Sequence, residues 1–182
     1  MAVFLLVLAG ALYWQQRAQA PGEAEPTPVP TQPLLFPVTS EEISGLRVEG
    51  SAGEAVALER EADGPWELVD PAGEGTDTAQ VENRLSQLTS LRVRTSLEPA
   101  PDLSIFGLDS PDYRVILSTL GGQEYHLAIG DVTPTGDGYY VQMNENPPQV
   151  VNKNSIDTLL GMLADPPVAA TTPTPGTPGT DE

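Results

Sequence analysis

The chain has 182 residues, and its 26 acidic and 8 basic side chains give a formal net charge of −18. It contains no cysteine, which excludes disulfide bonds, thiolate metal sites and a cysteine nucleophile. A field this negative repels phosphate backbones, so we expect no nucleic-acid partner.

Most of the negative charge lies in the middle of the chain. The terminal segments hold only four acidic residues and one basic residue: Glu23, Glu25, Asp181, Glu182 and Arg17. Subtracting these from the totals of 26 and 8 leaves 22 acidic and 7 basic side chains in residues 34–165, a net charge of −15. A segment of this length can bury a self-supporting core. We therefore predict one acidic domain over residues 34–165.

Residues 1–14 form an uncharged apolar run that closes with an aromatic pair. A spanning helix needs about 20 apolar residues, whereas a signal peptide has a shorter apolar region and a cleavage site such as the A-x-A motif at residues 18–20. The aromatic pair suits a membrane interface, and no basic residue precedes the run. We favour a retained single-pass anchor, with residues 1–17 in the lipid bilayer, over a cleaved signal. Both interpretations of residues 1–20 place the domain on the extracytoplasmic side of the cell membrane.

Two proline-rich segments flank the predicted domain. Residues 21–33 contain five prolines, which favour an extended polyproline II spacer of on the order of 40 Å. Residues 166–182 mix Thr, Pro and Gly and offer almost nothing to bury. We predict that they form a disordered tail.

Alternation of apolar and polar residues predicts three strands in the first half of the domain, at residues 46–51, 54–61 and 65–69. A short helical turn or bend at residues 40–43 precedes them. Asp63-Gly64 is a strong hairpin signal between the second and third strands.

After these strands the hydrophobic period becomes helical. Asp77 can cap a helix, and Gln80 follows three residues later in a capping-box arrangement. Residues 92–96 read as a strand that leaves this helix. The apolar residues of the helix fall on one face: Val81, Leu85 and Leu88.

The second half repeats this plan. A helix starts near Asn154 or Ser155 and ends at Pro166, and we expect its Leu160 to occupy the central place that Leu85 has in the first helix. A Gly121-Gly122 turn joins the first two strands of this half. The predicted strands are residues 113–120, 123–129, 138–144 and 149–152. The apolar helical face comprises Ile156, Leu159, Leu160 and Leu163.

This order of elements defines the expected fold class. Short alternating strands linked by hairpins imply a mainly antiparallel sheet, and two helices with one apolar face each can pack on the same side of it. We therefore predict an α+β domain built from two strand-strand-strand-helix repeats, with the helices on one side.

Seven short motifs lie along residues 34–167: Leu35-Phe36-Pro37, Gly64-Pro65-Trp66-Glu67-Leu68, Phe106-Gly107-Leu108-Asp109-Ser110-Pro111, Ile129-Gly130, Tyr139-Tyr140-Val141, Leu159-Leu160 and Asp165-Pro166-Pro167. Together they resemble an uncharacterised bacterial family, the domain of unknown function DUF4340. The resemblance rests on a combination of short motifs rather than on any one of them. Members of that family typically carry an N-terminal membrane anchor, and some are encoded near gliding-motility-type ABC transporters, which implies an accessory role. The family has no established catalytic residues, so the resemblance implies none here.

Two places in the sequence suggest a metal site, but for each of them an interpretation without metal is stronger. His126 is the single histidine, and a zinc site needs further nitrogen or sulfur ligands; we expect it on the wet face of its strand. Residues 131–137 begin like a calcium loop, but the twelfth position is Gln142 rather than a bidentate Glu. We interpret this segment as a hairpin loop and expect no metal and no cofactor.

The most distinctive motif is Phe106-Gly107-Leu108-Asp109. It predicts a turn in which Gly107 has a positive φ, with Phe106 and Leu108 filling the core between the two halves. The alternative is an interaction loop formed by the four residues.

No motif carries recognisable catalytic chemistry. There is no G-x-S-x-G sequence and no phosphate-binding glycine loop, so we predict that the chain is not an enzyme. The function that we expect is an anchored interaction domain in a membrane protein complex, such as an ABC transporter. The alternatives are a ligand-binding module that uses a groove between the repeats and, less favoured, an unrecognised hydrolase.

Overall fold

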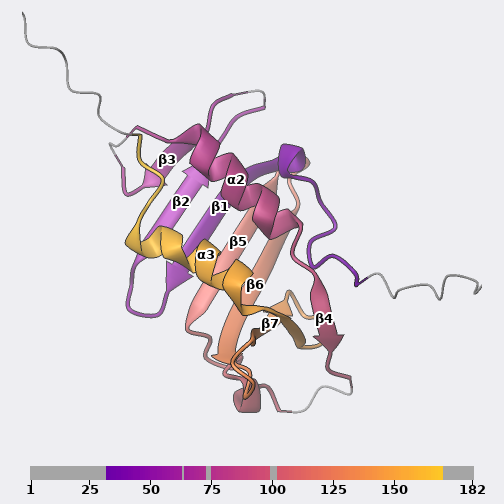
Figure 1. The fold of residues 1–182 in the computed structure, drawn as a ribbon. Helices are drawn as coiled ribbons and strands as arrows, with labels where there is room; N and C mark the ends of the chain where they lie inside the picture. The colour runs from indigo at the N-terminus through magenta and orange to yellow at the C-terminus, as the bar shows by residue number, and fades with distance from the viewer. Residues whose placement is uncertain (1–31, 63, 73–74, 99–101, 170–182) are drawn as a thin grey trace, which may run out of the picture. The chain divides into compact units, whose positions relative to one another are not determined.

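The computed structural model describes residues 32–62, 64–72, 75–98 and 102–169 (Figure 1). It contains one antiparallel sheet, two α-helices and two short 3₁₀ turns. The strands are β1 (Ile43–Gly50), β2 (Ala55–Glu59), β3 (Glu67–Asp70), β4 (Val93–Ser96), β5 (Tyr113–Thr119), β6 (Glu124–Val132), β7 (Gly138–Met143) and β8 (Gln149–Asn152). The helices are α2 (Thr78–Thr89) and α3 (Lys153–Ala164), and the turns are η1 (Ser40–Glu42) and η2 (Leu103–Phe106).

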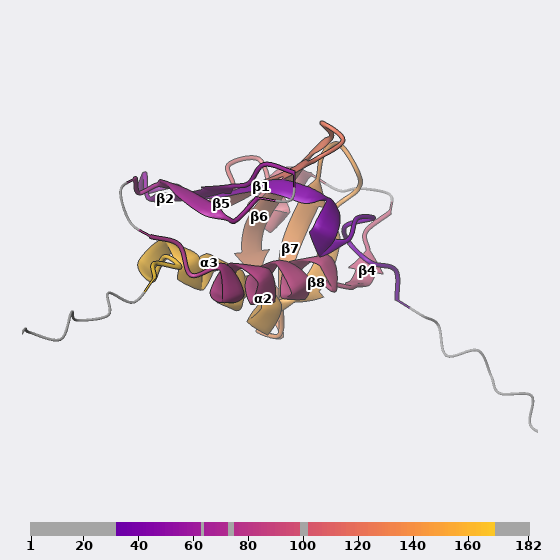
Figure 2. The ribbon, with the colours of Figure 1, turned by 90° about the horizontal axis from the view of Figure 1, so that it is seen from above.

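The eight strands form a single sheet in the order β3-β2-β1-β5-β6-β7-β8-β4. Every neighbouring pair is antiparallel, and the two halves of the domain meet where β1 pairs with β5. Figure 2 shows α2 and α3 on the same face of the sheet. The α+β class, the mainly antiparallel sheet and the one-sided helices are therefore confirmed.

The two halves exchange their last segments. The chain leaves α2 and forms β4, which pairs with β8 of the second half. The chain leaves α3 and pairs residues 167–169 with residues 75–77 of the first half, where Asp77 N donates to Pro167 O at 2.9 Å and Ala169 N donates to Gly75 O at 2.7 Å. Each helix thus crosses the sheet and delivers the chain to the other half.

The core lies between the sheet and the two helices. In β1, Leu46 and Val48 point into it and are 2% and 0% exposed, whereas Arg47 is exposed on the opposite face. The pleat of a strand produces this alternation, which is the pattern that the sequence shows. The helices contribute Val81, Leu85, Leu88, Ile156, Leu159 and Met162.

The helix starts differ in detail from the prediction. Asp77 caps α2 by accepting from Gln80 N at 3.0 Å, but the Gln80 side chain accepts from Arg84 Nη2 instead of closing the capping box. Helix α3 starts at Lys153 with Asn152 as its cap, just before the predicted start near Asn154 or Ser155.

The central leucine of α3 is Leu159, not Leu160. Leu159 is 3% exposed and fully within the core, while Leu160 is half-buried and packs at the edge of the core. The two leucines are adjacent, so the apolar stripe runs Ile156-Leu159-Met162 rather than in steps of four and three.

Hydrogen bonds extend the domain past residues 34–165 at both ends. Val93 N donates to Pro33 O at 2.9 Å, and the pairing of residues 167–169 closes the other end. The predicted anchor at residues 1–20, most of the spacer and most of the tail lie outside the described residues. Within the part that is described, neither helix is long and apolar enough to cross a membrane.

Candidate functional site

The distinctive loop is a capped 3₁₀ turn. Asp102 accepts from Ser104 N at 3.1 Å at the start of η2, and Gly107 ends it with a φ of 68°. A positive φ is strained for residues with a Cβ atom, so the predicted role of Gly107 is confirmed.

Phe106 and Leu108 do not fill the core between the two halves. Both are buried, at 8% and 5% exposed, but neither belongs to the main core cluster. The Phe106 ring packs on Tyr140 with centroids 4.6 Å apart. Tyr140 alternates with core-facing Tyr139 and Val141 along β7, so this contact lies on the helix-free face of the sheet.

Gly130 allows the loop to reach this position. A Cβ atom at residue 130 would lie only 2.1 Å from Phe106 O, so no other residue type leaves room for the loop backbone. A register shift in β6 between Ile129 and Val132 accompanies the close approach. The sequence contained this signal in Ile129-Gly130, but the pattern of one strand does not say which loop packs against it.

The exposed side chains of the loop are mostly not the four residues predicted to form an interaction loop. Ile105 is 65% exposed, and of the four predicted interaction residues only Asp109 is exposed. Phe106 and Leu108 hold the loop on the sheet, which leaves Ile105 and Asp109 as the exposed side chains beside them. The interaction role of this loop stays a prediction.

The two candidate metal sites of the sequence are His126 and the hairpin at residues 131–137. His126 is exposed on the helix-free face, and its Nε2 lies 3.6 Å from Glu124 Oε2. Within the hairpin, Asp137 accepts from Thr135 Oγ1 at 2.5 Å and pairs with Arg94 Nη1 at 2.8 Å. The hydrogen bond from Thr135 and the pairing with Arg94 lower the pKa of Asp137. No group of three or more potential metal ligands occurs in the described residues.

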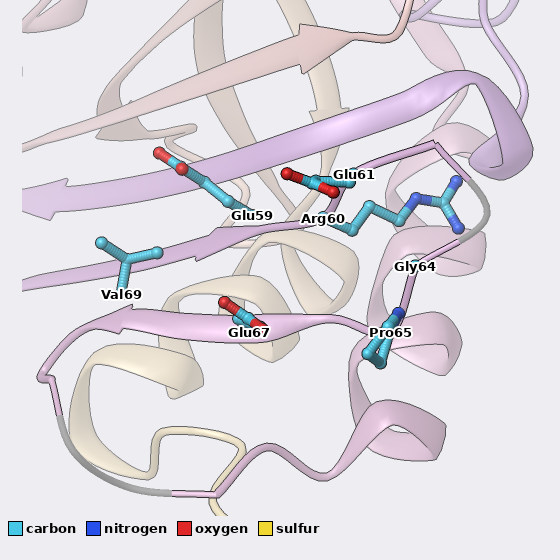
Figure 3. A pocket seen from close by; sticks show the side chains of 7 residues that line it. All are labelled: Glu59, Arg60, Glu61, Gly64, Pro65, Glu67 and Val69. Atoms are coloured by element: carbon cyan, nitrogen blue, oxygen red, sulfur yellow. The ribbon is translucent and has the colours of Figure 1, made fainter.

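A hollow of about 400 Å³ lies at the β2–β3 edge of the sheet (Figure 3). Its walls include three carboxylates, and two of them, Glu59 and Glu67, face each other directly across the strand pair. Its lining residues are Glu59, Arg60, Glu61, Gly64, Pro65, Glu67 and Val69.

Arg60, the one arginine that lines this hollow, directs its guanidinium to backbone carbonyls rather than to the carboxylates of the hollow. Figure 3 shows Arg60 extending away from Glu59 and Val69. Its Nε donates to Ile43 O at 2.7 Å, and its Nη2 donates to Glu41 O at 2.7 Å and to Ser40 O at 3.0 Å. The guanidinium also lies 4.8 Å from the centroid of the buried Trp66 ring. Arg60 therefore fastens η1 to the sheet and leaves the neighbouring carboxylates uncompensated.

A second hollow, of about 190 Å³, lies on the helix-free face over β5, β6 and β7. Ile116 and Ala128 form an apolar floor, and Arg114, His126 and Gln142 stand around it. The strand register brings these side chains together, because Ile116 pairs with His126, and Ala128 lies between Arg114 and Gln142.

The fold defines a small α+β domain with one antiparallel sheet and two helices on one face. A family model with the description "Domain of unknown function (DUF4340)" matches residues 66–160, which is just over half of the 182 residues. The chain belongs to this family. No curated protein and no solved structure matches it significantly.

Proposed function

We propose that this protein is a non-catalytic, membrane-anchored interaction domain on the extracytoplasmic side of the cell membrane, where it serves as an accessory or structural component of a membrane protein complex. The observation that carries this proposal is the helix-free face of the sheet. An apolar centre with a polar rim is the usual anatomy of a protein interface, and the hollow over Ile116 and Ala128 has both.

Charge indicates the kind of partner. Residues 34–165 carry a net charge of −15, and in the described part of the chain the ion pairs with Arg or Lys occupy only three carboxylates. The surplus negative charge favours a partner with a basic surface, through faster encounter and correct orientation. The three paired carboxylates are Glu49, Asp137 and Asp157.

The ligand-binding alternative has less support. On the helix side of the junction between the halves, Leu46 and Leu117 are 2% and 0% exposed, so packed side chains occupy the space that a groove would need. The hollow at the β2–β3 edge is lined by carboxylates without a free counter-charge, which is a poor match to a pocket with an apolar lining and a few convergent polar groups.

The partner can be sought by co-purification. The tagged full-length chain would be isolated from detergent-solubilised membranes beside an Ile116→Glu variant and a Thr158→Glu control on the exposed side of α3. Loss of a central interface residue should reduce the recovered partner about tenfold or more, whereas the control should recover the same partner as the unmodified chain. Equal recovery with both variants would contradict docking through the helix-free face.

The membrane side can be tested separately. Because the chain has no cysteine, a Val69→Cys variant would carry a single reactive thiol at a site that is 45% exposed. In cells whose outer barrier has been removed but whose cell membrane is intact, a membrane-impermeant maleimide should label this thiol. Labelling only after the membrane is lysed would contradict the extracytoplasmic location.

A further inference from the structure

One basic side chain of the domain has no partner within it. Residues 34–165 carry seven basic side chains against 22 acidic ones, and six of the seven donate a hydrogen bond to an oxygen atom of the described chain. The seventh is Arg114, whose guanidinium makes no hydrogen bond and no ion pair with any residue that the structure describes. Its five N–H donors therefore remain available. The six bonded side chains are Arg47, Arg60, Arg84, Arg92, Arg94 and Lys153.

The strand register explains why Arg114 lacks a partner. Glu49 lies directly opposite it on β1, but the Glu49 carboxylate accepts from Arg47 Nε at 2.6 Å. On its other side Arg114 faces Ala128 of β6, which carries no charge. Asp112, two residues earlier in the chain, forms no ion pair with it either. The sheet thus positions an exposed arginine and leaves its charge without a direct partner.

Arg114 stands beside the hollow on the helix-free face. This hollow of about 190 Å³ has eight lining residues, and none of them is a carboxylate. Its volume is below the roughly 300–1,000 Å³ of small-molecule sites, so it suits one side chain of a protein partner better than a free ligand. Its floor, formed by Ile116 and Ala128, is apolar, which matches an aliphatic side chain.

The distinctive loop borders the same hollow. Tyr140 and Gln142 point to the same face of β7 because they are two residues apart, and Gln142 lines the hollow. The register places Gln142 beside Ala128, and Ala128 beside Arg114. Since the Phe106 ring packs on Tyr140, the loop lies at the Arg114 end of the hollow. A partner side chain in the hollow is therefore next to both the arginine and the loop.

We propose that this site receives an acidic residue of the protein partner, whose carboxylate binds Arg114, together with a neighbouring aliphatic side chain that fills the hollow. The proposal rests on the proposed function, in which the partner docks through the helix-free face. An exposed ion pair contributes little to stability. A guanidinium, however, binds a carboxylate through two parallel hydrogen bonds, and an interface that excludes water strengthens the pair. Arginine is also among the residues that dominate binding at the centre of interfaces.

The charge of the whole domain makes this proposal specific. A net charge of −15 over residues 34–165 favours a partner surface that is basic on average, and it repels polyanions such as nucleic acids. A single carboxylate within such a basic surface finds its counter-charge at Arg114. Reversal of the charge at residue 114 should therefore weaken binding, whereas the same reversal at an arginine outside the site should not.

Charge variants of the full-length chain test this sign. Tagged chains would be isolated from detergent-solubilised membranes, and the amount of partner recovered per chain would be measured. Arg114→Lys should retain most of the partner, Arg114→Gln should lower its recovery on the order of tenfold, and Arg114→Glu should lower it further. The matched control is Arg92→Glu, which changes the net charge equally beside β4, about 19 Å from β5 across the sheet; it should recover at least as much as the unmodified chain. Thermal melts would check that the variants are folded, and Arg114→Gln carries the test if Arg114→Glu does not fold.

A zero-length cross-link identifies the partner residue. The chain has a single lysine, Lys153, so Lys153→Arg with Arg114→Lys leaves one side-chain amine, on the helix-free face. A carbodiimide would activate a carboxylate in contact with this amine, which then forms an amide while the carbodiimide takes up the lost water as a urea. The linked residue should be an Asp or Glu of the partner next to an aliphatic residue. Lys153→Arg with Thr158→Lys, on the exposed side of α3, is the control and should give no link to the partner.

The outcomes separate this inference from the proposed function. If Arg114→Glu recovers as much partner as the unmodified chain or more, the site does not receive a partner's carboxylate and the interaction domain stands. The same conclusion follows if the introduced amine links only to carboxylates of the chain itself, such as Glu49 or Asp112. A link to a partner carboxylate that has no aliphatic neighbour would overturn the role of the hollow. If the unmodified chain recovers no partner, both the inference and the proposed function are overturned.

Discussion

At the scale of single residues, Gly130 determines where the distinctive loop packs. A Cβ atom there would meet Phe106 O at 2.1 Å, so Gly130→Ala forces the loop or β6 to move. Overpacking of this kind costs about 1–3 kcal/mol. Gly121→Ala is the matched control, because its Cβ would lie 3.8 Å from the nearest atom, Thr119 Oγ1. Denaturant melts should show a lower midpoint for Gly130→Ala only. Equal midpoints would mean that the loop is not held on β6.

A second residue-scale prediction concerns Glu59 and Glu67. These like charges lie directly opposite each other on β2 and β3, an arrangement that destabilises a sheet. Glu67→Lys replaces it with an opposite-charge pair and should raise the free energy of unfolding by about 0.2–1 kcal/mol. Glu145→Lys, in the exposed turn before β8, changes the net charge equally without forming the pair. The difference in stability between the two variants should shrink at high salt. Equal stability of the two variants at low salt would refute the argument.

At the scale of elements, the strands could be predicted from the sequence and their order in the sheet could not. Alternation marks each strand because one face of the sheet is buried and the other is not. It marks β4 as well, but its partner depends on where α2 delivers the chain, which is a tertiary property. The predicted repeats therefore contained β4 and β8 without indicating that they pair.

The helix faces give the prediction that belongs to this scale. Leu85 and Leu159 are 1% and 3% exposed, so truncation of either to Ala should cost about 2–5 kcal/mol. Leu160 is half-buried, and its truncation should cost about half as much. Denaturant melts of the three variants would decide the order. A larger cost for Leu160→Ala than for Leu159→Ala would place the apolar stripe of α3 one residue further on.

At the scale of the whole molecule, the sequence predicted the amount of charge but not its distribution. The value of −15 for residues 34–165 follows from counting. The gathering of Glu59, Glu61 and Glu67 at the β2–β3 edge appears only in the structure, where the Arg60 guanidinium is turned toward the η1 carbonyls. Alternation along its strand alone assigns His126 to the solvent-exposed face of the sheet. It does not place Phe106 on the helix-free face, because the position of that loop depends on tertiary packing.

The last prediction concerns how much of the chain the domain needs. Because residues 33 and 167–169 complete hydrogen bonds with the opposite halves, a fragment of residues 32–169 should unfold cooperatively and at a higher denaturant midpoint than a fragment of residues 34–165. The shorter fragment loses the bonds from Val93 N to Pro33 O, from Asp77 N to Pro167 O and from Ala169 N to Gly75 O.

At about 0.5–1.5 kcal/mol each, these three bonds amount to roughly 1.5–4.5 kcal/mol, a large part of the stability of a domain of this size. Urea titrations of the two fragments, followed by Trp66 fluorescence and by circular dichroism, would measure the difference. Identical midpoints would show that the end segments add nothing and that the exchange between the halves is confined to β4. A molten or aggregated longer fragment would contradict the single self-supporting domain itself.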